Sequence, residues 1–342
     1  MAISVIKQKK SNIKFSEIFS DLTPELDSIN QIILDNCSGE ADLIADIGRH
    51  IILPGGKRIR PILTILSAYI CNYNNLNNHH HNLAAAVELI HTATLLHDDV
   101  VDSGELRRGK KTANSIWGNK ASILVGDYLL STAFQLMVKS NSIKVLDLLS
   151  NTSRIMSDGE VMQLMNSSDI DIKEDKYIKI ISQKTAILFA AATSVGAIIS
   201  NAKLEKERAL YSFGINLGIA FQIMDDILDY SSSSNVLGKE IGDDFFEGKV
   251  TLPIIIAYEK ANNDDKKEIK HIFSQNIMNN EKDPSLFDRI MYFIKKYDAV
   301  NISKSKALSY HQKAIENISI FSESKEKNML LHILDYSIGR IK

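Results

Sequence analysis

The chain has 342 residues, of which 44% are hydrophobic and 24% are charged, and its net charge at pH 7 is -2. This composition is typical of a soluble globular protein, and the nearly balanced charge gives no reason to expect a nucleic-acid partner. No run of about 18 uninterrupted apolar residues predicts a membrane span. The only two cysteines, Cys37 and Cys71, lack the spacing of a disulfide framework or a zinc site, which favours a reducing, cytoplasmic location.

The first 61 residues contain two basic segments. The N-terminal segment lacks the apolar core of a secretory signal, so we expect a frayed cationic terminus, with a weak targeting peptide as the alternative. Residues 55–61, Gly-Gly-Lys-Arg-Ile-Arg-Pro, place three positive charges behind two glycines. Arginine forks two phosphate oxygens and lysine supplies a compact charge, so this segment is a candidate phosphate-binding site.

The placement of proline predicts long helices. The chain has five prolines, and none stands between Pro61 and Pro253. Proline in a helix interior costs about 3 kcal/mol, and apolar residues in this interval recur at steps of three, four and seven. No sustained alternation predicts a sheet, and nothing resembles an interdomain linker. We expect an all-α protein of one domain, residues 1–342, with helices at 61–73, 83–102, 121–138, 142–165, 174–200, 205–230 and 251–262, and several more within 285–340.

A segment rich in asparagine and histidine lies between the first two of these helices. Residues 74–82 include the run His79, His80 and His81. Because compositional bias of this kind is common in surface loops, we expect a solvated loop here rather than a metal site.

Two copies of the pattern D-D-x-x-D, at residues 98–102 and 225–229, stand in apolar helical stretches. Positions i and i+4 share a helix face, so Asp98 and Asp102 point the same way. Their repulsion disfavours the helix by a few tenths of a kcal/mol, which a bound cation would offset. Oxygen ligands without histidine or cysteine favour Mg²⁺, which binds through one or two carboxylates together with substrate phosphates. The two motifs therefore predict a magnesium-diphosphate site between two helices.

Polar and cationic residues accompany both motifs. His91 stands two turns before Asp98 on the same face, and Gln222 stands three residues before Asp225. The remaining candidates follow the motifs or lie between them: Arg107, Arg108, Lys184, Thr185, Lys239 and Lys249. Alone, each would be an ordinary surface or core residue, but beside the paired carboxylates they are candidate diphosphate ligands.

These segments resemble the motifs of the trans-isoprenyl diphosphate synthases (polyprenyl synthetases). The matching sequences are GGKRIRP, LLHDDVVD followed by RRGK, and FQIMDDILDY followed by LGKEIGDDFFEGK, collinear over about residues 50–260. The resemblance implies a single large helical bundle with a central active-site cavity. It implies a Mg²⁺-dependent prenyltransferase that condenses isopentenyl diphosphate onto an allylic diphosphate such as farnesyl diphosphate. About three Mg²⁺ per active site and a homodimer are also implied.

The resemblance assigns roles residue by residue. The positions that bind isopentenyl diphosphate are Lys57, Arg60, His91 and Arg108. The magnesium ligands are Asp98, Asp102 and Asp225, and the motifs are completed by the catalytic carboxylates Asp99, Asp226 and Asp229. The positions that contact the allylic diphosphate are Arg107, Lys184, Thr185, Gln222, Lys239 and Lys249, of which Lys184 and Lys239 are counted as catalytic. In this family the departed pyrophosphate is the usual base, so no side-chain base is expected.

Residues before the first motif predict the product length. In this family, bulky aromatics four and five residues before the first aspartate stop chain growth, whereas this chain has Thr94 and Ala93 there, with aliphatic Ile90 deeper. One helical turn rises about 5.4 Å, close to one isoprene unit, so small residues here leave a deeper pocket. We predict a long product, of the octaprenyl type that supplies quinone side chains, with peripheral membrane contact at product release.

Three alternatives remain open at this point. A shorter-chain farnesyl or geranylgeranyl diphosphate synthase differs only in its product. A terpene cyclase shares the all-α fold and the first motif, but usually lacks the second D-D-x-x-D and the Gly-Gly-Lys-Arg segment, both of which are present. An inactive regulatory subunit would require degraded acidic motifs, and both are intact.

Overall fold

A computed structural model describes residues 20–37, 41–52, 56–74, 78–107, 109–231, 241–278 and 282–339. Within these ranges every regular element is helical except for one hairpin of two-residue strands, so the predicted all-α class is confirmed. The first half contains α2 (Thr23–Asn36), α3 (Asp42–Ile52), α4 (Ile59–Ile70), α5 (His79–Val101), β1 (Leu106–Arg107), β2 (Lys110–Lys111), α6 (Ala113–Trp117), α7 (Asn119–Val138) and α8 (Ile143–Met165). The second half contains α9 (Glu174–Ile181), a π-helical turn η2 (Ser182–Ala186), α10 (Ile187–Ile199), α11 (Leu204–Leu228), α12 (Asp243–Phe246), α13 (Leu252–Lys260), α14 (Asn263–Met278), α15 (Pro284–Lys296), α16 (Ala299–Asn317), η3 (Ile318–Ile320) and α17 (Lys325–Ile338).

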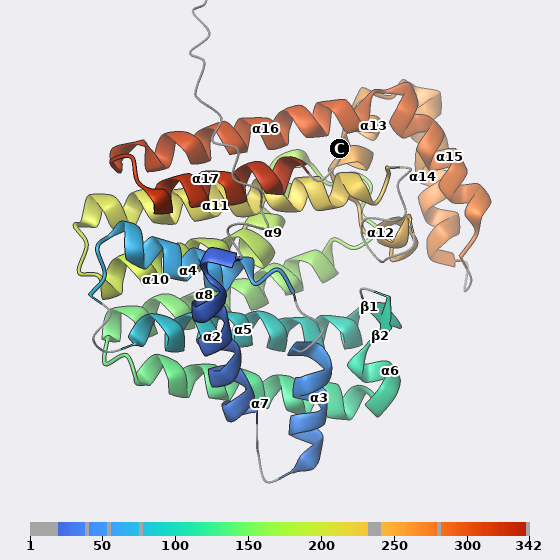
Figure 1. The fold of residues 1–342 in the computed structure, drawn as a ribbon. Helices are drawn as coiled ribbons and strands as arrows, with labels where there is room; N and C mark the ends of the chain where they lie inside the picture. Colours follow the sequence, from blue (N-terminus) through green and yellow to red (C-terminus); the bar gives the residue numbers. More distant parts are fainter. Residues whose placement is uncertain are drawn as a thin grey trace, which may run out of the picture.

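The long helices run side by side through the molecule. Figure 1 shows α16, α11, α5 and α7 nearly parallel, while α2 and α3 cross the bundle steeply. Contacts between α5 and α7, α11 and α16, α10 and α11, and α4 and α10 hold the bundle together. The carboxyl ends of α5 and α11 lie at the same end of the bundle, beside the β hairpin and α12 (Figure 1). The two acidic motifs are therefore at one end.

Helix α11 connects two groups of buried apolar side chains. Its first half contributes Phe213 and Leu217 to a core shared with α4, α5, α7 and α10. Its second half contributes Ile223 and Ile227 to a core shared with α13, α14 and α15. Each fully buried side chain of this kind is worth roughly 1.5–3 kcal/mol. The same helix thus fixes the second acidic motif rigidly against both cores.

A close helix approach sets the position of α11. A Cβ added at Gly218 would lie 2.5 Å from the Cα of Ala186, which real Cβ atoms do not tolerate. A side chain at Gly218 would therefore push α11 away from the π-helical turn and alter the spacing of the residues that line the site.

The predicted helices agree with the structure to within a few residues at most ends, but one expectation was wrong. The run His79, His80 and His81 forms the first turn of α5 instead of a solvated loop, and His80 is fully buried. The reason is tertiary packing, because the ring of His80 contacts Tyr69 of α4 and the ring of His81 contacts Glu25 of α2. The basic N-terminal segment lies within residues 1–19, which are outside the described part of the chain.

Two helical segments of the described chain have the length and hydropathy of a membrane span. They are Asn119–Val138 and Glu174–Ile199. In the most apolar 18 residues of each segment, 44% of the first and 78% of the second are buried inside the protein. The second segment is a core helix of the bundle, and its apolar character is explained by packing. The first segment, α7, leaves a large part of its apolar surface uncovered.

Candidate active site

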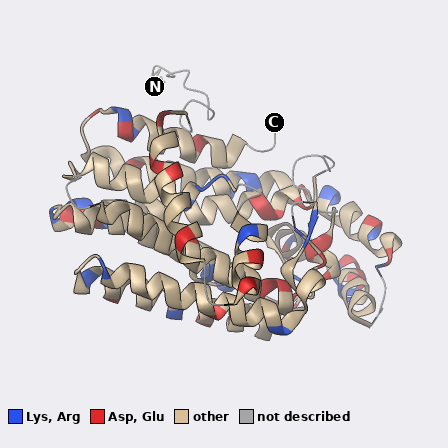
Figure 2. Cartoon of the chain, turned by 60° about the horizontal axis from the view of Figure 1, so that its bottom comes forward, with Lys and Arg blue, Asp and Glu red and all other residues tan. Residues whose placement is uncertain are grey.

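The two acidic motifs face one cavity of about 770 Å³ at the end of the bundle. Fourteen of the predicted residues line it, and they come from α4, α5, η2 and α11 and the connections between helices. They are Lys57, Arg60, His91, Thr94, Asp98, Asp102, Arg107, Lys184, Thr185, Gln222, Asp225, Asp226, Asp229 and Lys249. Figure 2 shows long stretches without Lys, Arg, Asp or Glu along the helices, with acidic and basic positions at many helix ends and outer faces.

In the first motif, two carboxylates face the cavity and the third has another partner. Asp98 and Asp102 line the cavity, as their spacing of four residues predicts. Asp99 is 6% exposed and does not line it. Its carboxylate accepts a forked pair of hydrogen bonds from Arg107, at 2.7 Å from Nη2 and 3.0 Å from Nε. Asp99 therefore orients Arg107, which itself lines the cavity.

In the second motif, hydrogen bonds fix the carboxylates of Asp226 and Asp229. Asp226 is buried and accepts hydrogen bonds from Tyr177 (2.6 Å) and Gln222 (2.8 Å). Burial raises the pKa of Asp226 well above its usual range, with nearby Asp244 adding to the effect. The Asp229 carboxylate accepts hydrogen bonds from the backbone N–H groups of Gly242 and Asp244, which fixes the chain after α11.

Two lysines lie against carboxylates of the first motif. The Nζ atom of Lys249 is 2.9 Å from Asp102 and 2.6 Å from Glu247. The Nζ atom of Lys184 is 4.0 Å from Asp98 and 2.7 Å from Glu160. Burial lowers the pKa of Lys249, but Asp102 and Glu247 outweigh it and the pKa is raised, so the lysine stays cationic. Fixed cations of this kind suit an anionic substrate at the cavity.

A π-helical turn presents Lys184 and Thr185 to the cavity. π-Helical turns are rare in proteins, and those that occur often lie at functional sites. The turn η2 lies against α8, where a Cβ on Gly159 would be 2.7 Å from the backbone nitrogen of Lys184. The Thr185 hydroxyl donates to Gln222 (2.9 Å), which in turn donates to Asp226. The turn is thereby connected to the second motif.

A strained residue precedes α4 and aims the basic segment at the cavity. Arg58 has a left-handed backbone (φ 46°), a conformation that costs about 1–2 kcal/mol for a non-glycine residue. Its guanidinium donates to Glu88 (2.5 Å) and to the carbonyl of Ile52 (2.7 Å), which holds this conformation. Lys57 then contacts the hydroxyl of Tyr336, and the Arg60 guanidinium lies 4.4 Å from the centre of the Phe189 ring.

The positions proposed to set product length lie in two environments. Thr94 lines the cavity, one turn below Asp98 on α5. Ala93 and Ile90 are buried in the core and are not among the residues that line this cavity. Thr94 is thus the member of this set that lies in direct reach of a bound ligand.

Two predicted residues, Arg108 and Lys239, lie outside the described residues. Conversely, the cavity includes residues that sequence reasoning missed, among them Glu160 and Tyr177. Tyr177 stands seven residues before Lys184, a helical spacing that offered a signal. Glu160 belongs to no sequence motif. It reaches Lys184 only because α8 packs against the π-helical turn.

The environment of Asp98 predicts a pH dependence. Burial raises the pKa of Asp98 to about 6. The nearby carboxylates of Glu160 and Asp102 also raise this pKa, and the cations of Lys184 and Arg107 lower it. A carboxyl must lose its proton to bind a cation, so affinity for a divalent cation should fall as the pH drops through about 6. We expect Mn²⁺ binding, followed by electron paramagnetic resonance, to be about tenfold weaker at pH 5 than at pH 7.5. In Asp98→Asn this difference should shrink, whereas equal affinity at both pH values in the unaltered chain would contradict the prediction.

The fold and the cavity define a class of protein: an all-α enzyme with paired aspartate motifs and fixed cations around one cavity. Comparison with known proteins gives the family. The polyprenyl synthetase family model matches residues 41–290, which is more than half of the chain, and the chain belongs to this family. The predicted resemblance and the prenyltransferase class are thereby confirmed.

Individual relatives agree with this assignment. The octaprenyl diphosphate synthase of Haemophilus influenzae is 36% identical over 333 residues, covering 97% of this chain and 99% of its own. The crystal structure of a decaprenyl diphosphate synthase from Rhodobacter capsulatus superposes with a TM-score of 0.89 at 37% identity, covering 96% of this chain and 100% of its own. The crystal structure of a polyprenyl synthase from Caulobacter crescentus, complexed with calcium and isoprenyl diphosphate, superposes with a TM-score of 0.90 at 38% identity. The match covers 96% of this chain and 98% of that one.

Proposed function

We propose that this chain is a long-chain trans-polyprenyl diphosphate synthase that condenses isopentenyl diphosphate onto an allylic diphosphate. The observation that carries the proposal is the convergence of both acidic motifs and six lysine and arginine side chains on one cavity. Carboxylates bind divalent cations and the cations bind phosphate oxygens, so the cavity suits a metal-diphosphate complex. The relatives at 36–38% identity act on, or are named for, prenyl diphosphates, which supports the same substrates here.

The donor set of the cavity fits magnesium. Asp98, Asp102 and Asp225 offer hard oxygen ligands from two helices, and no cysteine lines the cavity among the described residues. The raised pKa of Asp98 reflects a buried carboxylate that a cation would stabilise. These three aspartates would hold about three Mg²⁺ ions. When bound, the magnesium would neutralise charge that builds on the pyrophosphate as it leaves the allylic carbon.

The cationic side chains of the chain bind and orient the two substrates. Lys184, Lys249 and Arg107 lie beside the first motif, where they meet the allylic diphosphate. Lys57, Arg60 and His91 line another part of the cavity, where they bind isopentenyl diphosphate. Because these groups are held by Glu160, Asp99 and the turn at Arg58 before the substrates arrive, they need little reorganisation during the reaction.

The reaction then follows from the positions of the two diphosphates. The allylic carbon–oxygen bond breaks and its electron pair leaves with the pyrophosphate. The double bond of isopentenyl diphosphate attacks the allylic cation, a new carbon–carbon bond forms, and the pyrophosphate accepts the proton that is lost. Apolar side chains such as Phe189 and Phe221 line the cavity and keep water from the cation.

We propose a product of octaprenyl length that serves as a quinone side chain. Small Thr94 below Asp98 and the octaprenyl and decaprenyl names of two relatives support a long chain. Incubation with isopentenyl diphosphate and farnesyl diphosphate, followed by dephosphorylation and chromatography, tests the length. A product of farnesyl or geranylgeranyl length would overturn the long-chain proposal and leave the family assignment intact.

We propose that the chain folds as one domain and forms a homodimer in the cytoplasm. The dimer would contact a membrane only to release its product. Helices α7 and α8 each expose several apolar side chains, and we take these together as the apolar patch of a dimer interface. The patch consists of Ile123, Leu124, Phe134, Val138, Ile143, Val161, Leu164 and Met165. Its most exposed members on α7 are Leu124 (67%) and Val138 (60%).

Charge placed on this patch should disrupt the dimer. We expect the unaltered chain to have the mass of a dimer in multi-angle light scattering, and the Leu124→Asp, Val138→Asp double variant to be monomeric at the same concentration. Leu308→Asp is the matched control, because Leu308 is an exposed apolar residue on α16. A monomeric unaltered chain, or a double variant that stays dimeric, would show that this surface is not the interface.

A further inference from the structure

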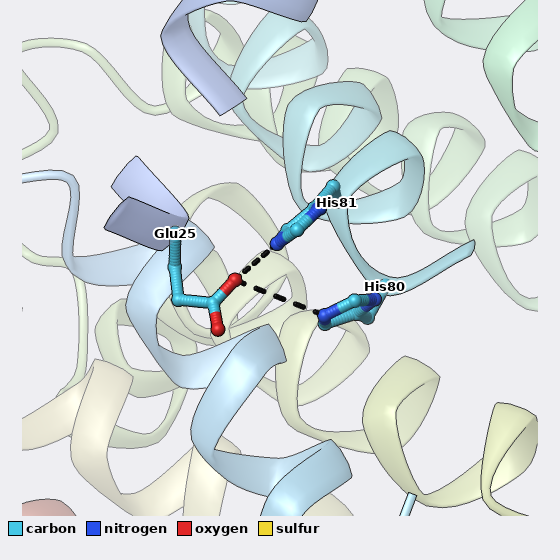
Figure 3. Close-up of side chains that lie close together, drawn as sticks. All are labelled: Glu25, His80 and His81. Atoms are coloured by element: carbon cyan, nitrogen blue, oxygen red, sulfur yellow. Dashed lines mark hydrogen bonds and ion pairs between the residues drawn. The ribbon is translucent and has the colours of Figure 1, made fainter. Parts of the chain in front are cut away.

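A second cluster of potential metal ligands lies far from the cavity. Glu25 on α2 and His80 and His81 in the first turn of α5 each offer one ligand atom, and these atoms all lie within 4.8 Å of one another. Figure 3 shows both imidazoles turned toward the Glu25 carboxylate. His80 precedes Asp98 by 18 residues on the same helix, which is about 27 Å along its axis. The cluster is therefore separate from the active site.

The arrangement of the two histidines is unusual for neighbours on a helix. Adjacent helical residues normally point about 100° apart. Here the rings of His80 and His81 stack, with 4.0 Å between their centres and 25° between their planes. The stacking brings the Nε2 atoms of both rings to the same carboxylate (Figure 3). Two imidazole nitrogens and a carboxylate oxygen thus converge on a small volume.

Hydrogen bonds explain only part of this cluster. Glu25 is in contact with His81 Nε2 and with the Tyr69 hydroxyl. His80 Nε2 is 3.9 Å from Glu25, which is too long for a hydrogen bond, and 3.4 Å from the Tyr69 hydroxyl. Its Nδ1 atom is buried without a hydrogen-bond partner among the described residues. A fully buried imidazole with one long hydrogen bond is a group for which a bound ion is an ordinary explanation.

The chemistry of the three donors indicates the ion. Two histidines and one carboxylate are a known zinc ligand set, with the fourth position taken by water or another oxygen donor. Ligation needs a neutral imidazole, and the full burial of His80 favours the neutral form. Zn²⁺ holds nitrogen ligands at about 2.0–2.1 Å, so on binding His80 would move toward the ion, while His81 and Glu25, which are in direct contact without it, would move apart to admit it. Tyr69 lies beside the cluster as a further oxygen donor.

We propose that Glu25, His80 and His81 form a binding site for a divalent transition-metal ion, Zn²⁺ in the first place, that fastens α2 to the start of α5. The two helices already pack against each other, and Glu25 is joined to residues of both α4 and α5. A bound ion would add bonds between segments far apart in the sequence. It would stabilise the folded chain by mass action, since the unfolded chain does not hold these ligands together.

The experiment uses the full chain without a histidine tag, stripped with a chelator and then titrated with Zn²⁺ by calorimetry. We expect one Zn²⁺ per chain that is absent from the His80→Asn, His81→Asn double variant, and a Zn²⁺-dependent rise in melting temperature that the variant lacks. Co²⁺ should give the visible absorption bands of a low-symmetry site in the unaltered chain only. Both proteins keep the active-site carboxylates, so any binding there cancels in the comparison.

Matched variants separate a metal site from a hydrogen-bonded clasp. Asparagine retains an N–H donor toward Glu25 but is a weak zinc ligand, and His79→Ala removes the third histidine of the run without touching the cluster. His79→Ala should bind Zn²⁺ like the unaltered chain, while His81→Asn alone should weaken binding by at least about tenfold. Equal Zn²⁺ stoichiometry and affinity in the unaltered chain and the double variant, with both folded by circular dichroism, would leave a hydrogen-bonded clasp only and overturn the proposal.

Discussion

Asp98→Asn and Asp225→Asn should each lower the turnover of prenyl transfer by on the order of 10³-fold or more while leaving the fold intact. Each removes a carboxylate that faces the cavity and, in our proposal, a magnesium ligand. The fold should survive Asp98→Asn because burial raises the pKa of Asp98 to about 6, which means that the carboxylate, although mostly ionised at pH 7, destabilises the folded chain relative to the unfolded one. Turnover is measured with radiolabelled isopentenyl diphosphate, and the melting temperature by circular dichroism.

The matched control for these variants is Asp288→Asn. Asp288 is an exposed aspartate on α15, so its replacement should change neither turnover nor melting temperature. If Asp98→Asn or Asp225→Asn turned over at the rate of the control, these aspartates would not hold the metal and the assigned roles would be wrong. If instead the melting temperature fell sharply, the loss of activity would report unfolding, and binding of Mn²⁺ to the folded fraction would decide the question.

Thr94→Phe should shorten the main product by several isoprene units. Thr94 lines the cavity one turn below Asp98, and a turn rises about 5.4 Å, close to the length of one unit. A phenyl ring there would block the path of the growing chain without touching the diphosphate ligands. The products of condensation onto farnesyl diphosphate, dephosphorylated and separated by reversed-phase chromatography, give the chain length directly.

Two further variants on α5 bracket this result. Val101→Phe is the matched control, since Val101 is 53% exposed and the same ring there should leave the product unchanged. Ala93→Phe tests whether the growing chain also passes Ala93, which is buried in the core beyond the lining of the cavity. An unchanged product in Thr94→Phe would contradict the idea that the chain grows past this side of α5.

The parts of the site that sequence predicted are those in which helical spacing alone fixes the direction of a side chain. Asp98 and Asp102 face the cavity together because they are four residues apart on one long helix. The same argument places His91 and Thr94 on that face. The limits of the helices followed from the positions of proline and the apolar periodicity, which are local properties.

What sequence did not predict depends on packing between distant segments. Glu160 reaches Lys184 only because Gly159 lets α8 approach a π-helical turn, and no local pattern marks such a turn. Asp99 belongs to the same acidic motif as Asp98, yet it turns to Arg107, which follows the helix by only a few residues. His80 and His81 looked like loop residues by composition, and the contact with Glu25, 56 residues before His81, makes them part of a buried cluster.

The central claim is that the two acidic motifs form one metal-dependent site for prenyl transfer, and a single assay tests it most directly. The purified full chain is incubated with radiolabelled isopentenyl diphosphate and farnesyl diphosphate, first with a chelator and then with Mg²⁺ added back. We predict label in a long-chain, acid-labile prenyl product that is absent with the chelator and restored by Mg²⁺. Equal incorporation with the chelator present, no incorporation above the Asp98→Asn background, or conversion of farnesyl diphosphate to a hydrocarbon without use of isopentenyl diphosphate would contradict it.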